Sequence, residues 1–144
     1  MKNIARAAFI TIMVSACGGS GSGSGGGSGG DQGTLTSPVA LGDYPITAYS
    51  GSVGVATSIE SGSYYKVDAI APGGSYNVSL TNSTGAVFLY AYDNSSFTTG
   101  WLCNDGANIA ADLACTASAV SGPSLYIQVI NNDITDVSYT LTVE

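Results

Sequence analysis

The stretch "SYNVSLTN", residues 75–82, decides the fold class because its side chains alternate strictly. Tyr76, Val78 and Leu80 are apolar, and the residues between them are polar. Successive side chains of a β-strand point to opposite faces of a sheet, so this period of two predicts a half-buried strand. The same alternation returns in "VSYTLTV", residues 137–143. Both stretches therefore indicate a sheet with one apolar face and one polar face.

Working outward, the rest of the chain also has the pattern of short strands joined by turns. The expected strands are rich in Tyr, Val and Ile, and the turns between them contain Gly, Pro, Asn and Asp, which favour turn conformations. No stretch keeps a 3.6-residue period, so the chain is predicted to be all-β and to fold as a sandwich. The remaining expected strands are "SYYKVDAI" (63–70), "AVFLYAY" (86–92), "LYIQVIN" (125–131) and one or two weaker strands within 45–59, whereas residues 93–115 are expected to be irregular.

Cys103 and Cys115 are an even pair of cysteines in the part of the chain that folds. In an exported protein such a pair predicts a disulfide. The closed loop would hold about 13 residues, for which the chain-entropy model gives roughly 3 kcal/mol of stabilisation. A metal site is the alternative, but no further soft ligands accompany the two thiols.

The first 17 residues have the features of an export signal. Lys2 and Arg6 provide positive charge, and residues 7–14 form an apolar run too short for a membrane helix, which needs about 20 residues. The run ends in "VSAC", which resembles the lipobox of bacterial lipoproteins. The resemblance implies that residues 1–16 are removed and that Cys17 is lipidated. An ordinary secretory signal with an incidental cysteine is the alternative.

Residues 18–33 hold ten glycines and four serines and contain no large apolar side chain. Such a sequence cannot offset the entropy lost on ordering, so residues 17–33 are expected to form a flexible tether with a reach of roughly 20–25 Å. The folding domain is then predicted to be residues 34–144. Gly18, in the position after the cysteine, favours sorting to the outer membrane by resemblance to lipoproteins. The predicted location is thus the periplasmic or surface face of that membrane, with the lipid as membrane contact.

The charge and the residue types present exclude several classes of function. After removal of the signal, the chain has one base, Lys66, against ten acids, which gives a net charge of −9. This surface opposes nucleic acid and anionic lipid headgroups. Histidine is absent, which removes histidine-based triads and histidine-ligated zinc or copper. A serine–lysine pair using Lys66 stays open, although a solvated strand lysine is favoured, and no cofactor is expected.

The order of these strands resembles the bacterial pre-peptidase C-terminal domain, a relative of the collagen-binding domain of secreted collagenases. The resemblance covers roughly residues 37–143. It implies a jelly-roll-like antiparallel β-sandwich that is not an enzyme and that serves as an adhesion or accessory module. The segments that carry it are "SYYKV" (63–67), "PGGSYNVSLTN" (72–82), "GAVFLYAYDNSSF" (85–97), "CTASAVSGPSLYIQV" (115–129) and "SYTLTV" (138–143).

One departure from the family concerns calcium. The family commonly has "GDxDLY" where this chain has "GAVFLY", so Ala86 and Phe88 replace two acids. Calcium prefers six to eight oxygen ligands, usually from converging carboxylates. Glu60 is the only acid in the segment before "YYKV", and the other acids are spread over separate turns. No metal site is therefore predicted, and a calcium-dependent adhesion module remains an alternative.

Aromatic side chains are the remaining candidates for function. The chain holds nine tyrosines and one tryptophan, and aromatic rings on a sandwich face provide rigid contact area for a ligand. Tyr90, Tyr92 and Trp101 are the candidate contacts for an extracellular protein or a polysaccharide. Half of such rings should instead lie in the core, and Trp101 could pack on the disulfide. A contiguous exposed aromatic patch would favour binding, whereas a uniformly polar surface would favour a structural envelope lipoprotein with no ligand pocket.

Overall fold

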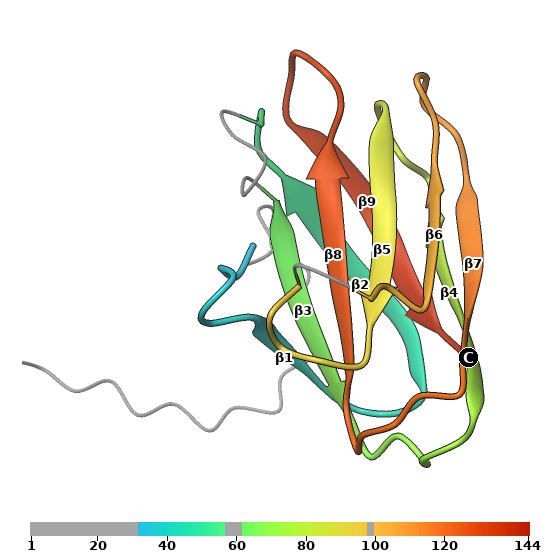
Figure 1. The fold of residues 1–144 in the computed structure, drawn as a ribbon. Coiled ribbons are helices and arrows are strands. Elements are labelled where there is room, and N and C mark those ends of the chain that lie inside the picture. Colours follow the sequence, from blue (N-terminus) through green and yellow to red (C-terminus); the bar gives the residue numbers. More distant parts are fainter. Residues whose placement is uncertain (1–31, 57–61, 98–99) are drawn as a thin grey trace, which may run out of the picture.

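The computed structural model describes residues 32–56, 62–97 and 100–144, which form a β-sandwich of two facing sheets (Figure 1). No helix able to span a bilayer occurs in this described part of the chain. Its strands are β1 (Val39–Asp43), β2 (Ile46–Val53), β3 (Ser63–Asp68), β4 (Ser75–Thr81), β5 (Val87–Tyr92), β6 (Cys103–Gly106), β7 (Leu113–Ser118), β8 (Leu125–Asn131) and β9 (Val137–Val143).

The two sheets contain five and four strands. Strand order is β1-β3-β8-β5-β6 in one sheet and β2-β9-β4-β7 in the other. The predicted β-sandwich is confirmed, and the alternation that predicted it has the expected effect, because Val78, Leu80 and Leu141 are fully buried between the sheets. A hydrogen bond of 2.7 Å between the hydroxyls of Tyr65 and Tyr139 joins β3 to β9 across this core.

One strand pair departs from the antiparallel prediction. β1 lies parallel to β3, whereas the other pairs of named strands are antiparallel. The chain leaves β1 for β2 in the opposite sheet and then returns to β3. Such a crossover lets two strands of one sheet run in the same direction.

The prediction that residues 93–115 are irregular is wrong for part of the stretch. β6 and the start of β7 lie within it, and they form the edges of the two sheets on one side of the sandwich. The predicted disulfide is confirmed: Cys103 and Cys115 are bonded, with their Cα atoms 5.7 Å apart. The bond connects β6 to β7. It therefore links the two sheets at edge strands that are not paired with each other.

Several predictions fall on residues outside the described part of the chain. These are the signal at 1–16, the lipidated Cys17, most of the tether and Glu60. The described contacts begin at Gln32, whose carbonyl oxygen accepts a hydrogen bond of 2.7 Å from the Tyr64 amide. Gly33 has φ +59°, and a Cβ there would overlap the Tyr64 carbonyl oxygen. This glycine, grouped by sequence with the tether, is thus packed against β3.

Candidate functional site

The outer face of the five-stranded sheet carries most of the aromatic rings that do not enter the core. Pairing between strands sets Tyr64, Gln128, Tyr90 and Asn104 in one row across β3, β8, β5 and β6. Side chains opposite one another on the same face have Cβ atoms about 4.5–5.5 Å apart. The strands thus place aromatic and amide groups next to each other, and we call this surface the aromatic face.

The segment between β5 and β6 covers part of the aromatic face. Residues 93–97 run from the end of β5 across β8 toward β3, and residues 100–102 lead into β6 (Figure 1). Phe97, in this segment, is 5% exposed. Its ring meets the rings of Tyr64, Tyr92 and Tyr126 edge to face, with centroids 4.9–5.6 Å apart. Its φ of +52° is unusual for an aromatic residue, so these contacts offset a strained backbone.

We call the part of the aromatic face under Phe97 the covered half. Tyr92, a predicted ligand contact, lies in it and is only 4% exposed. Its hydroxyl donates a hydrogen bond of 3.0 Å to Gln128 Oε1, and Gln128 Nε2 donates one of 3.1 Å to the Tyr64 hydroxyl. Burial, with smaller contributions from Tyr90 and Tyr64, raises the pKa of Tyr92 to about 12. The structure therefore makes Tyr92 part of the packed face and does not offer its ring to a ligand.

Trp101 and Tyr90 form the open half of the aromatic face. Trp101 is 55% exposed and meets the half-buried Tyr90 ring edge to face, with centroids 6.1 Å apart. Tyr90 stacks in turn on Tyr92 at 6.4 Å. The backbone next to Trp101 is fixed because the Leu102 amide donates a hydrogen bond of 2.7 Å to the Ala91 carbonyl oxygen. An exposed indole therefore lies against the Tyr90 ring on this face.

Two further residues extend the open half. Asn104 is exposed and lies opposite Tyr90 in the pairing of β5 with β6. Phe88 lies opposite Gly106, and a Cβ at Gly106 would overlap the Phe88 ring. The glycine thus lets Phe88 lie across the edge strand. Trp101, Tyr90, Phe88 and Asn104 together offer aromatic surface with a hydrogen-bonding amide beside it.

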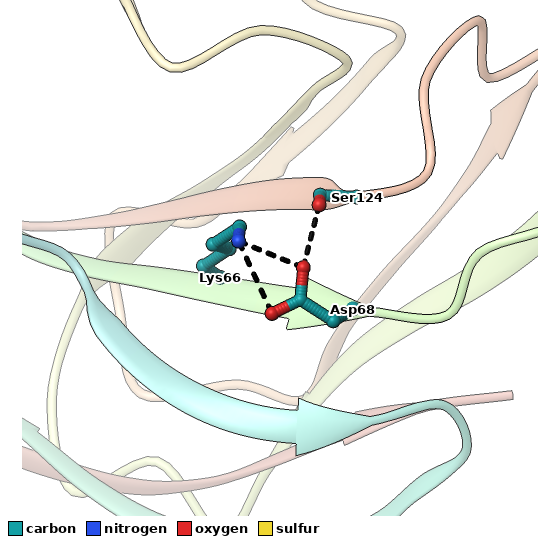
Figure 2. A network of polar contacts seen from close by, with 3 residues as sticks. All are labelled: Lys66, Asp68 and Ser124. Atoms are coloured by element: carbon teal, nitrogen blue, oxygen red, sulfur yellow. Dashed lines mark hydrogen bonds and ion pairs between the residues drawn. The ribbon is translucent and has the colours of Figure 1, made fainter.

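Lys66 lies on the same outer face, at the far side of the sheet, and forms an ion pair with Asp68 (Figure 2). Lys66 Nζ is 2.8 Å from Asp68 Oδ1, and the Ser124 hydroxyl donates a hydrogen bond of 2.6 Å to the same oxygen. The hydrogen bond to Asp68 raises the pKa of Lys66, and the bonds from Lys66 and Ser124 lower the pKa of Asp68. Lys66 therefore stays protonated at neutral pH, which opposes a role as the base of a serine–lysine pair.

No other part of the described chain offers a comparable site. Among the described residues, no three acidic, histidine or cysteine side chains cluster to hold a metal ion. A hollow of about 490 Å³ is lined by residues including Leu35, Val55 and Gly62. Because Val55 and Gly62 flank residues 57–61, which lie outside the described residues, we assign no site there.

Comparison with known proteins shows the fold. Neither a family model nor a curated protein sequence matches the chain. The structure is similar to the crystal structure of the pre-peptidase C-terminal domain of collagenase from Bacillus anthracis, with a TM-score of 0.51 and 16% sequence identity. The match covers 74% of this chain and 94% of that domain. The resemblance predicted from sequence is thus confirmed at the level of the fold.

The three aromatic residues predicted from sequence have different environments. Trp101 and Tyr90 lie together on the open half, while Tyr92 is packed under Phe97. Trp101 lies before the start of β6 and outside any strand, so its exposure could not be read from strand periodicity. Asn104 and Phe97 were missed, although "LCND" places Asn104 one residue after Cys103 and a strand there would have set it on the face opposite the disulfide.

Proposed function

We propose that the folded part of this chain is a non-catalytic binding or accessory module that contacts its ligand through the open half of the aromatic face. The observation that carries the proposal is Trp101, a tryptophan that the fold holds with 55% of its surface exposed beside Tyr90. Tryptophan and tyrosine are enriched where proteins bind their partners because they bury large areas at low entropic cost. The collagenase domain of the same fold is consistent with an accessory role.

The exposed aromatic rings favour a binding module over a purely structural envelope protein. A purely structural envelope protein needs only a polar surface. The outer face of the four-stranded sheet is polar in this way. The aromatic face differs, since its open half leaves apolar rings in water. The residue types support a non-catalytic role: the chain has no histidine, and its single strand lysine is paired with Asp68.

We further propose that the module is carried by a lipoprotein of the bacterial outer membrane, anchored through Cys17. The support is the "VSAC" motif after a short apolar run, followed by the glycine-rich tether. The intact mass of the full chain, purified from the membrane fraction of a bacterial host, should correspond to a polypeptide that starts at residue 17 and carries diacyl or triacyl modification. A soluble chain that starts elsewhere would refute the anchor.

Binding is tested with the full chain on an array of matrix proteins and polysaccharides. The W101A and Y90A variants should each lose most of the binding that the wild type shows. Ile134→Ala is the matched control, because Ile134 is 89% exposed and lies in the β8–β9 turn rather than on the aromatic face. An array on which the wild type binds nothing, or binding that survives both aromatic substitutions, would refute the binding module.

A further inference from the structure

We infer that the open half of the aromatic face binds a neutral polysaccharide, with Trp101 stacked against a sugar ring and Asn104 hydrogen-bonded to its hydroxyls. The inference rests on the proposed function and names its ligand class. It depends on three features of the described residues: the charge of the aromatic face, the exposed indole of Trp101 against Tyr90, and the position of Asn104.

The first feature is that the aromatic face carries no charge, which disfavours charged ligands. On β8, β5 and β6, the outward-facing strand positions hold no charged side chain; they are Tyr126, Gln128, Ile130, Phe88, Tyr90, Tyr92, Asn104 and Gly106. Lys66, the one base outside the signal, is paired with Asp68 on β3. An anionic polymer would therefore meet no free cation here and would be repelled by the acidic protein. A basic protein would find no carboxylate at these outward-facing positions, because Asp105 of β6 lies opposite the inward-facing Leu89.

The rings match the faces of a sugar. A pyranose presents patches of C–H groups with partial positive charge, and the face of an aromatic ring is negative, so the two attract as they exclude water. Stacking needs an exposed ring with a supporting contact. Trp101 provides both, since it is 55% exposed and the Tyr90 ring meets it edge to face at 6.1 Å.

Asn104 supplies the polar part of the site. A side-chain amide both donates and accepts hydrogen bonds, and so does a sugar hydroxyl. Asn104 is exposed and lies directly across from Tyr90 on the edge strand β6. A polymer lying along this edge would contact the rings with its C–H faces and the amide with its hydroxyls. A site open along an edge also accepts an internal segment of a long polymer, which an enclosed pocket would not.

The test uses the intrinsic fluorescence of Trp101, which is the only tryptophan in the chain and therefore reports on the site directly. The full chain is titrated with a neutral β-glucan, with neutral chitin oligosaccharides and with an anionic polyuronate. We expect a saturable emission change and protection from acrylamide quenching with at least one neutral saccharide, and neither effect with the polyuronate. Because no charges are paired, raising the salt concentration to about 0.5 M should change the apparent Kd by less than twofold.

Variants separate this inference from the broader proposal. N104A should weaken binding of the neutral saccharide by about fivefold, as expected for one lost hydrogen bond, and I134A should leave it unchanged. Binding of a matrix protein through Trp101, with no response to either neutral saccharide, would overturn the polysaccharide inference and leave the binding module standing. A preference for the polyuronate would also overturn it. If the wild type binds nothing on the array, both the polysaccharide inference and the binding-module proposal are refuted.

Discussion

The two outer faces of this sandwich are made of different residues. The four-stranded sheet exposes short polar side chains such as Asn77, Ser79, Thr140 and Thr142, with no aromatic ring among the outward positions of β4 and β9. The five-stranded sheet carries Tyr64, Phe88, Tyr90, Tyr92 and Tyr126 outward. The polar side chains of the first face can form their hydrogen bonds with water. Apolar rings exposed to water are costly, so the second face requires a cover, and the chain provides one over half of it.

The difference shows how a small sandwich separates stability from recognition. Phe97 buries Tyr64 and Tyr92, and that half of the aromatic face behaves as a second small core. Trp101 lies beyond this cover with 55% of its surface exposed, and the half-buried Tyr90 connects it to Tyr92. The covered half therefore supports the open half, and substitutions in the two halves should affect different properties.

The largest effect is expected from Phe97→Ala. This change removes the ring that packs on Tyr64, Tyr92 and Tyr126, and buried Phe→Ala substitutions cost about 3–5 kcal/mol. Urea unfolding of the full chain should show a loss of this order. A loss below about 1 kcal/mol would mean that the segment between β5 and β6 adds little to stability, and the distinction between covered and open halves would fail.

The next effect concerns the disulfide, which joins the two sheets rather than the two halves of one face. Replacing Cys103 and Cys115 together with alanine should lower the free energy of unfolding by about 2–4 kcal/mol, because the bond closes a loop with a sequence separation of 12. Thermal unfolding under oxidising conditions measures it. Reduced wild-type protein should approach the stability of the double variant; if oxidised and reduced proteins unfold alike, the link between β6 and β7 is unimportant for stability.

A smaller effect is expected from the titration of Tyr92. Its pKa in the folded state is about 12, above the value of 10.0 for an ordinary tyrosine, so folding favours the neutral phenol. The stabilisation from this difference in pKa is complete below pH 10 and is lost as the pH rises toward 12. By pH 11 the loss of unfolding free energy is about 1 kcal/mol.

The measurement compares the change in unfolding free energy from pH 8 to pH 11 in wild type and in Tyr92→Phe. The variant should lose less, by about 1 kcal/mol. Tyr65 and Tyr139, whose pKa values are also raised, contribute equally to both proteins and cancel. Equal losses in the two proteins would place Tyr92 in contact with solvent.

The smallest effect is expected on the opposite face. Thr140→Ala removes a hydroxyl from the outer side of the four-stranded sheet, and surface substitutions of this kind stay within about 0.5 kcal/mol. The variant should also bind ligand like the wild type. A large loss of stability or of binding would show that the polar face has a partner, which would reverse the assignment of roles to the two faces.

The sequence predicted the sandwich because alternation is a local signal. Tyr76, Val78 and Leu80 could be assigned to one side without knowing their neighbours, and cysteine parity identified the disulfide. β6 was missed, and residues 93–115 were predicted to be irregular, because "CNDG" is short, polar and at a sheet edge, where pairing with β5 rather than composition makes the strand. The parallel position of β1 likewise depends on a crossover that no local pattern encodes.

The site was predicted only in part for a similar reason. Aromatic content indicated Tyr90, Tyr92 and Trp101, but the difference between them depends on a long-range contact. Phe97 reaches back over β5 and β8 and buries Tyr92, while Trp101 falls beyond its reach. Which ring is covered is therefore a property of the tertiary structure, and a period of two along β5 gives Tyr90 and Tyr92 the same side without separating them.

The most direct test of the account is acrylamide quenching of Trp101 in the full chain without ligand. The claim that the open half is exposed predicts red-shifted emission, typical of an indole in water, and a quenching constant at least half of that in the urea-unfolded chain. Trp101 is the only tryptophan, so no other residue can produce the signal. Blue-shifted emission that resists quenching would show that Trp101 is covered, and the division of the aromatic face into two halves would be contradicted.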